Sequence, residues 1–176
     1  MTSQEYKNTI HMSKTIDDIR HELISNADEK TRLQGERFFK EDIKIHGLKS
    51  AQVVKISKAY YQMLPDKSKI VIFSFCEELW KLGFMEEAGI ASMWSYNVRK
   101  QYEPDDFKTF ETWVNKYVTN WAACDTLCNH TVGTFIEMYP LYLSDLKRWA
   151  KSENRWVKRA SAVSLIVPAR KGLFLE

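Results

Sequence analysis

The sequence predicts an all-α protein, and three observations lead to this fold class. Apolar residues recur at helical spacing along most of the 176 residues, and no convincing stretch alternates apolar and polar side chains as a strand would. Prolines, glycines and asparagines separate the apolar segments at positions that suit the ends of helices. Because 44% of the residues are apolar, the chain can bury a core without disulfides or a metal.

Two helices are expected before Gly47. Residues 1–14 show no clear period and are expected to fray, and the helical pattern begins at Thr15. Residues 26–28 (Asn-Ala-Asp) interrupt this pattern, and a second helix follows over residues 29–39.

A cap and a proline mark the next two helices. Ser50 is placed to act as the N-cap of a helix over residues 53–60. Pro65 and Asp66 suit the first turn of the following helix, because proline loses no hydrogen bond there and an acid meets the positive end of the helix dipole. That helix runs to Trp80. It contains the apolar run IVIFSF, which looks like a strand in isolation but has helical flanks.

The sequence pattern predicts five further helices in the second half of the chain. Gly83 precedes the first of them, and Pro104 repeats the start signal of the earlier proline. Asn120 is expected to cap the third helix, Pro140 to open the fourth, and Pro168 to end the last. The expected ranges are 86–100, 107–118, 120–133, 140–149 and 155–167.

Aromatic residues recur at a long period. Trp113 follows Trp80 by 33 residues, and Trp149 follows Trp113 by 36. Helix pairs with a period in the thirties are typical of an α-solenoid, or superhelix, of HEAT-like repeats. We therefore expect a single HEAT-like helical-repeat domain over residues 1–176. An irregular helical bundle is the alternative, because the repeats match in pattern more than in letters.

The basic residues are concentrated near the C-terminus. The whole chain carries a net charge of only +3. Eight basic residues face one acid, Glu153, between positions 147 and 171, so this segment carries +7 and the rest of the chain −4. Such a block is the electrostatic footprint of a phosphate-facing surface, and a solvated helix face is the alternative. The eight residues are Lys147, Arg148, Lys151, Arg155, Lys158, Arg159, Arg170 and Lys171.

The cysteines indicate neither a disulfide framework nor a metal centre. The chain has three cysteines, and only Cys124 and Cys128 lie near a histidine, His130. This spacing lacks the fourth ligand of a structural zinc site, so no metal and no cofactor are expected. No apolar run approaches the roughly 20 residues of a membrane span, and residues 1–14 are too polar for a signal peptide. A cytoplasmic protein without a membrane partner is therefore expected.

A candidate site lies in the segment NWAACDTLCNH, residues 120–130. Trp121 and Asp125 are four residues apart, so on a helix they leave one face about one turn apart. An aromatic plane then stands beside a carboxylate. The alternative is a core tryptophan next to a solvated or capping acid.

Two motifs carry a family resemblance. They are NWAACD at residues 120–125 and WAKSENRWVKRASAV at residues 149–163. Together, and in this order, they resemble the AlkD-like DNA alkylation repair family of DNA glycosylases. Weaker likeness extends upstream through ERFFK, HGLK and ELW, so that it covers the chain from about Lys30.

The resemblance implies a fold, an activity and a site. The fold is a HEAT-like solenoid whose basic concave face grips duplex DNA. The activity is that of an alkylpurine DNA glycosylase, which releases N3- or N7-alkylated purines in base excision repair. The family pattern places the catalytic residues at Trp121, Asp125 and Arg159, and we expect a monomer. Within the basic segment, the residues expected to contact DNA are Arg155 and Lys158 first, then Arg148 and Lys151.

Two departures leave alternatives open. Family members usually continue for one or two repeats beyond the arginine, whereas this sequence stops at Glu176, so it is either truncated or has a shallower cleft. Some relatives also lack glycosylase activity. The competing functions are therefore a catalytically inactive DNA-binding relative and a helical-repeat scaffold for a protein partner.

Overall fold

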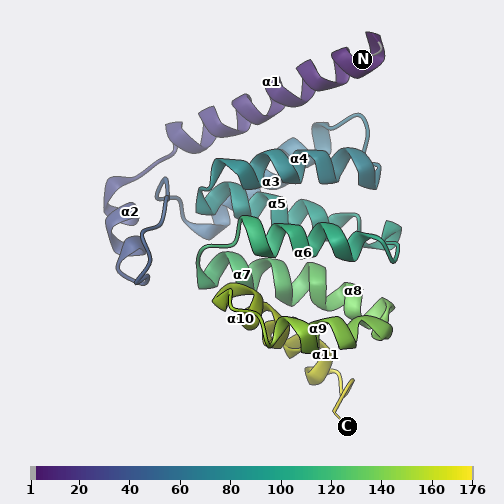
Figure 1. Ribbon diagram of the computed structural model, residues 1–176. Coiled ribbons are helices and arrows are strands. Elements are labelled where there is room, and N and C mark those ends of the chain that lie inside the picture. Colours follow the sequence, from purple (N-terminus) through teal and green to yellow (C-terminus); the bar gives the residue numbers. More distant parts are fainter. Residues whose placement is uncertain (1–2, 176) are drawn as a thin grey trace. The chain divides into compact units, whose positions relative to one another are not determined.

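The computed structural model describes residues 3–175, and every regular element in that range is helical (Figure 1). The IVIFSF run lies inside a helix. Among the described residues, the one β-type contact is an isolated bridge between Lys44 and Phe84. No helix in the described range combines the length and apolar character that a membrane span needs. The predicted all-α class is confirmed. The HEAT-like repeat arrangement stays a prediction.

The chain divides into two compact units, residues 1–91 and 92–176. Whether they form the expected single domain stays a prediction. The described helices of the first unit are α1 (Ser3–Ser25), α2 (Glu29–Glu36), α3 (Ser50–Met63), α4 (Lys69–Leu82) and the first half of α5 (Met85–Asn97). The second unit contains the rest of α5, then η1 (Arg99–Gln101), α6 (Asp106–Lys116), α7 (Trp121–Leu127), the π-helical turn η2 (Cys128–Val132), α8 (Gly133–Met138), η3 (Pro140–Tyr142), α9 (Leu143–Trp149), α10 (Arg155–Val163) and α11 (Ile166–Arg170).

The helix α1 begins twelve residues before the position that the sequence pattern predicted. It starts at Ser3, so residues 3–14 are helical instead of frayed, while the first two residues lie outside the described range. Ile19 and Leu23 are fully buried and anchor α1, which packs on α3 and α4. No proline or glycine interrupts the preceding residues, so the helix can extend by one hydrogen bond per added residue.

The start of α4 also differs from the prediction. Pro65 and Asp66 do not form its first turn, because α4 begins at Lys69. The carboxylate of Asp66 accepts a hydrogen bond from the backbone N–H of Ser68 at 2.7 Å, and this Asx-type contact closes a turn ahead of the helix. The helix continues two residues past its expected end at Trp80, to Leu82, and Gly83 follows it in a left-handed conformation with φ of 74°.

A buried carboxylate organises the irregular segment between α2 and α3. Glu86, at the start of α5, accepts backbone hydrogen bonds from His46 (3.1 Å), Gly47 (2.9 Å) and Leu48 (3.2 Å). Gly47 has φ of 94°, and a Cβ atom there would lie 2.4 Å from the carbonyl oxygen of Asp28. The segment therefore needs both the acid and the glycine.

Aromatic side chains fill the core of the second unit. The rings of Phe107 and Trp149 stack with centroids 5.1 Å apart, and Phe110 and Phe135 meet edge-on at 5.6 Å. The last predicted helix is divided: α10 ends at Val163 and a short α11 follows. Pro168 was expected to end a helix but is the third residue of α11, a position where its missing N–H has no intrahelical partner to lose.

Candidate functional site

The helix α7 carries the first two candidate residues. Asn120 is buried, and its side-chain oxygen accepts a hydrogen bond from the backbone N–H of Ala123 at 2.9 Å. This contact confirms the predicted N-cap and fixes where α7 begins. Trp121 is then the first helical residue, and Asp125 lies about one turn later.

Arg159 of α10 grips the Asp125 carboxylate with two parallel hydrogen bonds. Its Nε donates to Oδ1 at 2.7 Å, and its Nη2 donates to Oδ2 at 2.8 Å. The hydrogen bond and the charge of Asp125 outweigh desolvation and raise the pKa of Arg159 above its usual value. The structure therefore brings together two residues that are 34 positions apart in the sequence, in the bidentate geometry that arginine favours with carboxylates.

Packing between α7 and α10 sets this pairing. The two helices are in contact, and α10 also packs against α6 and α9 (Figure 1). The thiol of Cys124 is fully buried and lies 3.6 Å from the backbone carbonyl oxygen of Trp156. Asn154 begins α10 by accepting from the N–H of Trp156 at 2.9 Å. Because Trp156 precedes Arg159 by one turn, these contacts fix the register that places the arginine opposite Asp125.

The three predicted catalytic residues are accessible from solvent. Trp121 is 40% exposed, which removes the alternative that it is a core residue. The side chains of Asp125 and Arg159 are 27% and 42% exposed. Asp125 is not simply a solvated acid, since both of its oxygens are held by the guanidinium. The contact is also an intramolecular ion pair, which is the structural alternative for Arg159, so the catalytic role of the two residues stays a prediction.

The four residues expected to contact DNA fall into two groups. Arg148 is already paired, with Nη2 2.7 Å from Glu111 and 3.0 Å from Asp145. Its hydrogen bond to Glu111 is the first of the interactions that raise its pKa, and the pair ties α9 to α6. Both ion pairs use Nη2, so the phosphate contact expected of Arg148 stays a prediction.

Lys151, Arg155 and Lys158 form the second group. All three are exposed: Lys151 lies in the turn that follows α9, and Arg155 and Lys158 lie on α10. The guanidinium carbon of Arg155 lies 4.4 Å from the centroid of the Trp156 ring, a cation–π arrangement that holds the head group near the surface of α10. The exposure of these cations is what a phosphate-facing surface requires.

A cluster in the first unit has the residue types of a metal site. Donor atoms of His46, Glu86 and Glu87 lie within 4.8 Å of one another. Glu86 already accepts three backbone hydrogen bonds, and Glu87 lies 3.0 Å from the imidazole Nε2 and 3.9 Å from Nε of Arg20. The arginine supplies positive charge, so we interpret the cluster as a buried ionic network. No local sequence signal indicated this cluster, because about forty residues separate His46 from the two glutamates.

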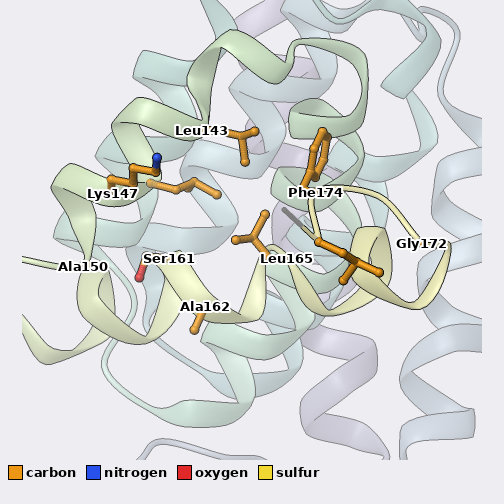
Figure 2. Close-up of a pocket in the computed structure, with 10 residues that line it drawn as sticks. Leu143, Lys147, Ala150, Ser161, Ala162, Leu165, Gly172 and Phe174 are labelled. Carbon is orange, nitrogen blue, oxygen red and sulfur yellow. The ribbon is translucent and has the colours of Figure 1, made fainter.

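An apolar pocket of about 700 Å³ lies in the second unit (Figure 2). Leu143 of α9, Leu165 and Phe174 turn their side chains toward it, and Lys147 places its amine at the edge. None of the three predicted catalytic residues lines this pocket. They lie instead on a surface that a large ligand can reach.

Comparison with known protein families gives a match over most of the chain. A family model described as DNA alkylation repair enzyme matches residues 19–176. The matched range includes α7, α10 and the paired residues that they carry. No curated protein matches the chain.

Proposed function

The chain belongs to the DNA alkylation repair enzyme family, and from this premise we propose that it is a DNA glycosylase that releases cationic N3- or N7-alkylated purines from duplex DNA. The observation that carries the proposal is the Asp125 carboxylate, held by Arg159 and one helical turn from the exposed ring of Trp121. The family match supports DNA as the substrate, and no cofactor enters the proposal.

The chemistry requires stabilisation of positive charge on the sugar. A purine alkylated at N3 or N7 is already cationic, so it leaves without a strong general acid. As the glycosidic bond breaks, positive charge grows on the deoxyribose. Asp125 supplies a fixed negative charge beside it and orients the attacking water. A carboxylate prepositioned by two hydrogen bonds is suited to this task, because little reorganisation is needed during the reaction.

Trp121 provides an aromatic face to the same charge. A cation over an indole ring gains about 0.5 to 2 kcal/mol, and more when water is excluded. The 40% exposure of Trp121 supports such a contact, because a ligand can reach the ring without unfolding the helix.

The surface position of the site supports recognition without a deep base pocket. Most glycosylases extrude the target base into an enclosed cavity. Here the proposed catalytic residues do not line the apolar pocket of the second unit, and all three side chains are at least partly exposed. Bulky cationic adducts are therefore acceptable substrates in this proposal. Lys151, Arg155 and Lys158 hold the neighbouring phosphates.

Two alternatives remain in competition with the enzyme. A catalytically inactive relative would bind duplex DNA with an affinity that falls as salt rises, because phosphate contacts release counterions. A scaffold for a protein partner need show no duplex affinity.

Base release from duplex DNA containing 7-methylguanine tests the proposal. The unmodified protein is expected to release the base, and Asp125→Asn to release it more slowly by on the order of a hundredfold. No release above background by the unmodified protein would refute the enzyme. Equal release by both proteins would remove Asp125 from the mechanism.

A further inference from the structure

We propose that Arg159 acts as a positioning residue, which orients the Asp125 carboxylate and joins it to a DNA phosphate through one guanidinium. This inference rests on the proposed glycosylase function. It goes beyond the family pattern, which only names Arg159 among the catalytic residues. The structure gives Arg159 a specific task, because its guanidinium is already engaged with the Asp125 carboxylate.

The donors of Arg159 divide into two sets. A guanidinium carries five N–H groups in a rigid plane. The Nε–H and one Nη2–H point at the two oxygens of Asp125, at 2.7 and 2.8 Å. Three N–H groups remain, two on Nη1 and one on Nη2. With 42% of the side chain exposed, these donors can meet a phosphate while the carboxylate contact stays intact.

The acceptors of Asp125 divide in the same way. Each carboxylate oxygen has two lone-pair directions, and the arginine occupies one on each oxygen. Two contacts on two oxygens also fix rotation of the carboxylate plane, which a single contact does not. The remaining lone pairs are available to a water or to the developing sugar cation, since the side chain is 27% exposed. Arg159 thus determines which lone pairs of the Asp125 carboxylate point toward the sugar and the attacking water.

The surrounding contacts hold this geometry in place. The Asn120 cap fixes the start of α7, and the approach of the Cys124 thiol to the backbone of Trp156 fixes the register of α10. A lysine at position 159 would keep the positive charge but would lack the planar fork. Charge and orientation are therefore separable by substitution.

The experiment compares two variants at position 159 with separate readouts for binding and for chemistry. Single-turnover release of 7-methylguanine at saturating protein reports the chemical step, and duplex affinity over a salt series reports the phosphate contact. Arg159→Lys is expected to keep its affinity within about threefold and the same salt slope, since the charge remains. Its release rate is expected to fall by roughly tenfold to a hundredfold, because the carboxylate loses its orientation.

Arg159→Ala is expected to lose both functions. Its salt slope should fall by about one phosphate contact, and its release rate should fall as well. Guanidinium chloride at a low millimolar concentration should restore part of the release by Arg159→Ala, compared with sodium chloride at equal ionic strength. It should not restore release by Asp125→Asn, which lacks the group that the guanidinium orients.

A double variant tests whether the arginine acts through the carboxylate. Once Asp125 is asparagine, the further change Arg159→Ala should lower the release rate at saturation by less than threefold, because the two residues work as a unit. Arg99→Lys is a matched control and should leave release unchanged, because the guanidinium of Arg99 stacks 4.3 Å from the Tyr96 ring and has no role in the proposed mechanism.

The outcomes separate this inference from the function on which it rests. No release by the unmodified protein overturns both. Normal release by the unmodified protein together with equal release by Arg159→Lys overturns only the positioning role. Independent effects of the two substitutions in the double variant overturn it as well, because a residue that acts through Asp125 cannot act without it.

Discussion

The imidazole of His46 lies with Nε2 3.0 Å from Oε1 of Glu87, a carboxylate with no exposed side-chain surface. Burial lowers the pKa of His46, but the hydrogen bond to Glu87 and the charges of Glu87 and Glu86 outweigh it, so the pKa is raised above 6.5. Arg20 of α1 is the cation that faces the same carboxylate, at 3.9 Å. Three segments of the first unit, α1, the residues before α3 and α5, thus meet at one ionic network.

Unfolding free energy should fall as the pH rises past neutrality. The raised pKa means that protonated His46 stabilises the folded state fully below its unfolded value of about 6.5, and that this stabilisation is lost as the pH rises through the folded value. Urea unfolding at several pH values between 5.5 and 8.5 measures the slope. Glu87→Gln should flatten it. The assignment would be contradicted if Glu87→Gln left the slope unchanged. It would also be contradicted if the control His21→Asn, on the exposed surface of α1, flattened the slope as much.

Local signals identified the helix ends that depend on local contacts. Asn120 caps α7 through its own side chain, as its residue type predicted, and Gly83, which was expected to precede the next helix, ends α4 in a left-handed conformation. Pro65 was misleading, because the next residue closes a turn with its carboxylate and delays the helix to Lys69. The sequence pattern alone does not show whether Asp66 begins a helix or closes a turn with the N–H of Ser68.

Two of the three residues of the candidate site were predictable from spacing. Trp121 and Asp125 lie four apart, which places them on one face of any helix that contains both. The position of Arg159 came from the family resemblance. Its bidentate contact depends on the register between α7 and α10, which buried contacts such as that of Cys124 determine. The network around Glu87 had no local signal at all, since His46 precedes it by 41 residues.

The carboxylate of Glu86 should be required for stability of the first unit. It accepts backbone hydrogen bonds from His46, Gly47 and Leu48, all within 3.2 Å. Glu86→Gln replaces one acceptor oxygen by a donor and removes the charge, so unfolding free energy should fall by about 1 to 3 kcal/mol. Urea unfolding midpoints measure the loss. Asp42→Asn is the control, because Asp42 is an exposed acid in the irregular segment between α2 and α3. Its substitution should change the unfolding free energy by less than about 0.5 kcal/mol.

Glycine should be required at position 47 for two separate reasons. Its φ of 94° strains any residue with a Cβ atom, and that atom would lie 2.4 Å from the carbonyl of Asp28. Gly172 shares the first reason only, because its φ is 77° but nothing lies within 4 Å of the added atom. Gly172→Ala should therefore cost about 1 kcal/mol, and Gly47→Ala clearly more. Thermal unfolding of both variants checks the order, and equal losses would mean that the backbone yields around Asp28.

Trp121 should contribute to base release far more than to folding. It is 40% exposed, so Trp121→Ala removes less buried surface than Trp113→Ala, at a tryptophan that is 1% exposed. Trp113→Ala should cost about 3 to 5 kcal/mol of unfolding free energy, and Trp121→Ala less. Loss of a cation–π contact of about 0.5 to 2 kcal/mol lowers single-turnover release of 7-methylguanine by roughly twofold to thirtyfold. Trp121→Phe keeps an aromatic face with a weaker quadrupole, so its release rate should lie between those of the unmodified protein and Trp121→Ala. The order of tryptophan, phenylalanine and alanine in release rate, measured on the folded proteins below their melting temperatures, distinguishes an electrostatic contact with a cation from simple packing. If phenylalanine and alanine release the base equally, the ring shapes the surface without stabilising charge.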